Sequence, residues 1–100
     1  AIQYYNKILE INAASQIDAL NSKGLALWEL HKYNEALPYF DRILAINSSN
    51  VKALNNKGLV LSGLEKYDGA LQYFDKLLSK NSSNIYALIN KGGALLGLDK

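Results

Sequence analysis

The chain repeats itself, and this internal repeat constrains its fold more than any other feature of the sequence. When residues 17–50 are aligned with residues 51–84 without a gap, about 20 of 34 positions are identical. A period of this length is typical of helical solenoids, in which each repeat is one supersecondary unit that stacks on its neighbour. The sequence therefore predicts an all-α solenoid.

Apolar residues recur at helical spacing twice within each repeat, so each repeat should hold two helices. The tetrad NSSN ends both full repeats, at residues 47–50 and 81–84. Asparagine and serine can cap the following helix, because their side chains accept hydrogen bonds from its first amides. Five or six helix-sized segments follow, at about residues 1–12, 17–30, 33–46, 51–64, 67–80 and 85–98.

These segments indicate one domain of repeats. Residues 17–50 and 51–84 are full repeats, whereas residues 1–16 match only a second helix and residues 85–100 match only a first helix. The stretch NAASQ, at residues 12–16, carries one residue more than the period allows. We expect the chain to turn there, as at the other joints between repeats.

The recurring residues resemble those of the tetratricopeptide repeat family. A single glycine marks each first helix (Gly24, Gly58 and Gly92), and Ala-x-x-x-Phe marks the second helices at Ala36 and Ala70. The family's tryptophan is replaced by leucine and its proline by serine. The resemblance implies a right-handed superhelical solenoid of antiparallel helix pairs. It also implies a protein–protein interaction module or scaffold that binds an extended peptide or a partner helix in a concave groove.

By position, the resemblance assigns ten candidate binding residues to this groove: Asn21, Ser22, Leu25, Trp28, Lys52, Asn55, Asn56, Leu59, Tyr86 and Asn90. An amide offers both a donor and an acceptor to a peptide backbone. Asn56 and Asn90, with Ser22 as a shorter counterpart, could therefore form a ladder along the groove. The same amides could instead bond to neighbouring helices or to water, and the sequence leaves both interpretations open.

Two further features have a structural and a functional interpretation. The stems of Lys23, Lys57 and Lys91 could cover the seam between helices while their ammonium groups reach water, or the three could form a basic row for an acidic segment. Trp28 could anchor a ligand or pack against a neighbouring helix.

Composition argues against an enzyme. The chain has one histidine, His31, no cysteine and no cluster of carboxylates, so no metal site, cofactor or nucleophile relay is expected. A net charge of +2, spread over both signs, makes nucleic acid an improbable partner. No apolar stretch approaches the roughly 20 residues that cross a bilayer. The lack of cysteine favours a reducing, cytoplasmic setting.

Self-assembly is the alternative function. The two half-repeats would each present an apolar face, formed by Ile2, Tyr5 and Leu9 at one end and by Leu88, Leu95 and Leu98 at the other. A solenoid normally covers such faces with a neighbouring repeat or a polar cap. End-to-end stacking would give a head-to-tail homo-oligomer. Flanking repeats of a longer chain would cover the same faces equally well.

Overall fold

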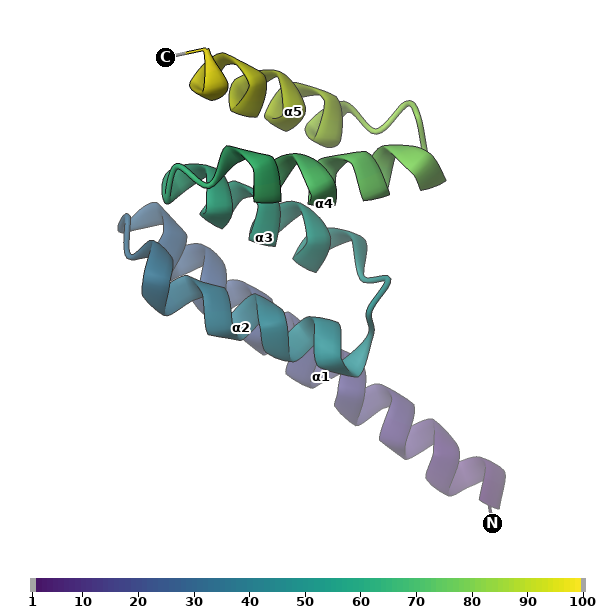
Figure 1. Cartoon of the computed structure of the whole chain (residues 1–100). Coiled ribbons are helices and arrows are strands. Elements are labelled where there is room, and N and C mark those ends of the chain that lie inside the picture. The colour runs from purple at the N-terminus through teal and green to yellow at the C-terminus, as the bar shows by residue number, and fades with distance from the viewer. Residues whose placement is uncertain (1, 100) are drawn as a thin grey trace.

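The computed structural model consists of α-helices joined by short turns (Figure 1). It describes the backbone of residues 2–99 and the side chains of residue 7 and of residues 10–99. The helices are α1 (Ile2–Glu29), α2 (Tyr33–Ile46), α3 (Val51–Gly63), α4 (Tyr67–Lys80) and α5 (Ile85–Leu98). No strand occurs in residues 2–99. The prediction of an all-α fold is confirmed.

The turn predicted at residues 12–16 is wrong, because α1 passes through this stretch as one helix of 28 residues. At the other joints the Oδ1 atoms of Asn50 and Asn84 accept hydrogen bonds from the backbone three residues on, at 2.9 and 3.0 Å, and so cap α3 and α5. Gln16 stands in the corresponding place of the first joint, and glutamine is a poor N-cap. Ala13 and Ala14 precede it, and alanine is the strongest helix former. The helix therefore continues.

The turns inside the repeats reverse the chain through one left-handed residue each. His31 has a φ of 61° and Glu65 a φ of 62°. The next backbone N–H, that of Lys32 or Lys66, donates to a carbonyl of the preceding helix at 2.9 or 2.8 Å. This arrangement satisfies carbonyls that a helix end would otherwise leave unpaired. It sends α2 and α4 back along the helices before them.

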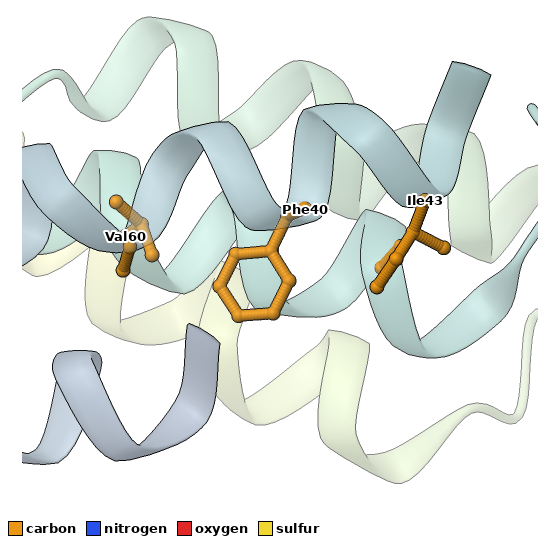
Figure 2. Packing of buried hydrophobic residues seen from close by; sticks show 5 residues of the cluster. Phe40, Ile43 and Val60 are labelled. Atoms are coloured by element: carbon orange, nitrogen blue, oxygen red, sulfur yellow. The ribbon is translucent and has the colours of Figure 1, made fainter. Parts of the chain in front are cut away.

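Aromatic side chains of the second helices form the centre of the core. Phe40 and Ile43 of α2 are fully buried, and they form one cluster with Val60 of α3 (Figure 2). Phe74 of α4 is also fully buried and clusters with Ala94 of α5. Burying a side chain of this size stabilises the fold by about 1.5–3 kcal/mol. The core is thus a row of clusters that links each repeat to the next.

Two glycines let the helices of a repeat approach closely. A Cβ atom on Gly24 would lie 2.6 Å from Cζ of Phe40, and one on Gly58 would lie 2.7 Å from Cζ of Phe74. Real Cβ atoms essentially never come closer than 3.0 Å to such an atom. Glycine is therefore required at these positions, although it weakens a helix interior by up to about 1 kcal/mol relative to alanine.

The helices form two layers of unequal spacing. Helix α3 contacts both α1 and α5, whereas the backbones of α2 and α4 stay more than 8 Å apart in the described part of the chain. A stack whose helices lie closer together on one side curves toward that side. The inner layer of α1, α3 and α5 therefore has the concave face.

Candidate functional site

The inner layer has two shallow hollows, and the first of them gathers most of the polar candidates. It has a volume of about 340 Å³ and is lined by residues of all three inner helices: Asn21, Leu25, Lys52, Asn55, Asn56 and Tyr86. All six are residues that the sequence assigned to the groove. Lys52 is the charged member of this lining, since the others are amides, a leucine and a tyrosine.

The second hollow has a volume of about 390 Å³ and is lined by more aliphatic and aromatic residues than the first. Three candidates line it: Trp28 of α1, Leu59 of α3 and Asn90 of α5. Six further residues complete the lining: Tyr33, Ser62, Gly63, Ile89, Gly93 and Ala94. Ser22, the remaining candidate, is exposed and lines neither hollow. We refer to the two hollows together as the groove.

Pairs of asparagines join the inner helices across the groove. The Nδ2 atom of Asn56 donates to Oδ1 of Asn21 at 2.7 Å, which links α3 to α1. In the same way, Nδ2 of Asn90 donates to Oδ1 of Asn55 at 2.8 Å, which links α5 to α3. Of the two interpretations that the sequence left open, bonding between neighbouring helices is therefore the one observed for Asn56 and Asn90.

The amides differ in how far a ligand can reach them. Asn56 is only 7% exposed, so its bond to Asn21 is mainly structural. Asn21, Asn55 and Asn90 are half-buried. One hydrogen bond uses one part of an amide, and the Nδ2 groups of Asn21 and Asn55 keep two N–H donors each after their Oδ1 atoms have accepted. The groove thus presents amide donors on two successive inner helices.

Trp28 has a part in both the core and the groove. Its side chain packs against the cluster around Phe40, and it also lines the second hollow with Leu59 and Ile89. Packing holds the indole in place, which lowers the entropy cost of a contact with a ligand. The two interpretations of Trp28 are therefore compatible with each other.

Sequence reasoning missed the contribution of α2 to the groove. Tyr33, the first residue of α2, reaches Gly63 at the end of α3, where an added Cβ would lie 2.6 Å from its ring. Tyr67 of α4 contacts Gly97 of α5 in the same manner. The signal was present in the sequence, because a tyrosine is followed by a glycine 30 positions later in both cases.

Two of the three repeated lysines form ion pairs with the preceding second helix. Lys57 pairs with Asp41 at 2.5 Å and Lys91 pairs with Asp75 at 2.7 Å. Partial burial alone lowers the pKa of Lys57, but hydrogen bonds and charge interactions with Asp41 and Tyr73 outweigh it and raise the pKa above its ordinary value of 10.5. The ammonium groups of these two lysines therefore bind carboxylates of the preceding second helix, a contact that neither interpretation predicted.

A larger hollow lies away from the groove. It has a volume of about 450 Å³ and is lined by Leu27, Glu35, Pro38, Tyr39 and Arg42. Four of these residues belong to α2, which is not part of the inner layer. None of the ten candidates lines this hollow, and it lacks both the paired amides and Trp28. The groove is therefore the stronger candidate site.

A curved stack of helical hairpins with a groove along its inner helices defines the class of helical-repeat proteins. A family model for the tetratricopeptide repeat matches residues 21–96. The chain belongs to the tetratricopeptide repeat family, whose repeats generally mediate protein–protein interaction and are typically not enzymes. A search of curated proteins found no match. Over the described residues, no helix combines the length and the apolar character needed to cross a membrane.

Proposed function

We propose that the chain binds an extended peptide segment of a partner protein in the groove. The observation that carries the proposal is the juxtaposition of two unlike features on one concave face. Amides with spare donors lie next to a hollow lined by Trp28, Leu59 and Ile89. Main-chain carbonyls of the ligand would accept from the amides, and an apolar side chain would fill the second hollow.

The spacing of the amides supports an extended ligand. Asn21 and Asn55 hold equivalent places in successive repeats, and packed helices lie about 8–10 Å apart. An extended peptide advances about 3.3 Å per residue. The ligand would therefore pass from Asn21 to the equivalent Asn55 within about two to three residues.

The first hollow favours an acidic residue in the part of the ligand that lies outside the second hollow. Lys52 and Tyr86 line it together with the amides. A carboxylate on the ligand near Lys52 would gain a modest, salt-sensitive attraction of about 0.2–1 kcal/mol. We therefore expect peptides with an acidic residue on one side of an apolar or aromatic anchor to bind best.

The test begins with random dodecapeptides displayed on phage and selected against the whole chain. Selected peptides are then titrated by fluorescence polarisation against the natural sequence and against Trp28→Ala, Asn55→Ala and the control Asn34→Ala. Asn34 is exposed on α2 and lines neither hollow. The first two variants should weaken binding at least fivefold, and the control should not weaken it.

Methylation of the peptide backbone does not test this mode well, because the ligand's carbonyls accept from the amides. Replacement of individual peptide bonds by esters tests it directly, because an ester carbonyl is a weaker hydrogen-bond acceptor than an amide carbonyl. Affinity should fall for the esters whose carbonyls face Asn21 or Asn55 and should change little for the others. Equal binding of all three variants, or failure of the selection to yield any peptide, would refute the proposal.

A further inference from the structure

Helix α5 exposes an apolar surface, whereas the equivalent surface of α3 is buried. Leu88 is 50% exposed and Leu95 is 46% exposed, and a Cβ atom added to Gly92 would meet nothing within 4 Å. We call these three residues the α5 slot. The equivalent residues one repeat earlier are Leu54, Gly58 and Leu61, of which Leu54 is 1% exposed and Gly58 is buried.

The α3 surface is covered by α4, and this contact defines what the α5 slot can accept. Ala70, Phe74 and Leu77 of α4 are all buried, and the ring of Phe74 lies directly over Gly58. The fitting partner is therefore a helix with an alanine, an aromatic residue four positions later and an aliphatic residue three positions after that. The α2 helix obeys the same rule with Ala36, Phe40 and Ile43.

One further segment of the sequence obeys this rule. Residues 1–12, AIQYYNKILEIN, have Ala1, Tyr5 and Ile8 at the three positions. The match is one of sequence, because the side chains of residues 1–6, 8 and 9, including the predicted contacts of Ile2, Tyr5 and Leu9, lie outside the described residues. Ile11, the apolar residue of this segment whose side chain is described, is 58% exposed.

The arrangement of the helices excludes a contact within one molecule. The first part of α1 extends away from the other helices, and it lies at the opposite end of the molecule from α5 (Figure 1). The molecule is 58 Å long, and α1 does not contact α5 within the described residues. An N-terminal segment that fills the α5 slot must therefore come from another molecule.

We propose that the α5 slot docks the N-terminal segment, residues 1–12, of a second copy of this chain. The contact would reproduce the packing of α4 on α3, with Tyr5 of one copy over Gly92 of the other. Because the two surfaces differ, the interaction is heterologous and propagates from copy to copy rather than closing into a symmetric dimer. This inference is independent of peptide binding in the groove.

Two neighbouring glycines give a matched test. Gly92→Ala places a methyl group where the incoming aromatic ring must lie, whereas Gly93→Ala places one in open space on the groove side. Both changes favour the helix equally. Sedimentation equilibrium from micromolar to millimolar concentration should give a rising mass for the natural chain and for Gly93→Ala. Gly92→Ala should associate at least tenfold more weakly, with an unchanged circular dichroism spectrum.

A mixing experiment identifies the occupant. Tyr5→Ala should also associate at least tenfold more weakly, because its slot is intact but its docking segment is not. Mixed with Gly92→Ala, which has an intact segment and a blocked slot, it should form a one-to-one complex and nothing larger. A natural chain that stays monomeric at millimolar concentration overturns the proposal. So does equal association of Gly92→Ala and Gly93→Ala, or association that Tyr5→Ala leaves unchanged, which would assign the slot another occupant.

Discussion

The same glycine position should have opposite effects on stability in two successive repeats. Gly58 lies under the ring of Phe74, which is fully buried and cannot move aside without disturbing the core. A methyl group at Gly58 would lie 2.7 Å from Cζ of that ring. Gly92 has the same place in α5, and a methyl group there would meet nothing within 4 Å. Alanine substitution therefore separates the steric effect from helix propensity.

The expected magnitudes follow from these two terms. Overpacking of a well-packed core costs about 1–3 kcal/mol. Replacing glycine by alanine within a helix gains about 1 kcal/mol. Gly58→Ala should therefore destabilise the chain by about 1–2 kcal/mol, because its steric cost is near the upper end of the range. Gly92→Ala should stabilise α5 by about 1 kcal/mol.

Urea denaturation followed by circular dichroism at low micromolar concentration measures the effect of Gly58→Ala without association between copies. Helix α5 has a neighbour on one side only and can open separately. Hydrogen exchange of the α5 amides therefore measures the effect of Gly92→Ala directly. The reasoning is refuted if Gly58→Ala unfolds at the same urea concentration as the natural chain, or if Gly92→Ala speeds exchange in α5.

Three other substitutions test the remaining contacts. Asn56→Ala removes a buried hydrogen bond and should cost about 1–2 kcal/mol by urea denaturation, whereas the exposed Ser22→Ala should change stability by less than about 0.5 kcal/mol. Asn50→Ala removes the cap of α3 and should cost about 1 kcal/mol in the same assay. Asp41→Asn breaks the ion pair with Lys57 and should cost less than about 1 kcal/mol at neutral pH. Because the folded-state pKa of Lys57 is raised above 10.5, this contribution is complete below that pH and is lost as the pH rises further. The urea midpoints of the natural chain and of Asp41→Asn should then converge.

The repeat period and its apolar spacing were sufficient to predict the helices from Tyr33 onward. Neighbouring repeats of similar sequence fold alike and stack on one another. Packing between repeats therefore supports the helical preference of each segment. The boundaries at Asn50 and Asn84 were predictable because their caps are chemically distinct from a helix interior. The continuation of α1 was not predicted, because the count of residues in NAASQ was given more weight than its two alanines.

The candidate site was predictable in its position but not in its bonding. Nine of the ten candidates line the two hollows, since face and repeat number fix where a residue of a first helix lies. The pairing of Asn56 with Asn21, and of Asn90 with Asn55, spans 35 residues rather than one period of 34. Such an offset depends on how neighbouring helices are displaced along their axes. That displacement is set by how the side chains of the two helices pack together, so it cannot be predicted from the sequence of either helix alone.

The unequal spacing of the two layers has a mechanical consequence. Side-chain amide bonds tie adjacent inner helices directly, while the backbones of α2 and α4 stay more than 8 Å apart in the described residues. When such a stack bends, the tied layer acts as the neutral axis, and the change in length falls on the outer side. Thermal flexing would therefore alter the separation of α2 and α4 far more than that of Asn21 and Asn55, so that a bound segment keeps its register while the scaffold around it deforms.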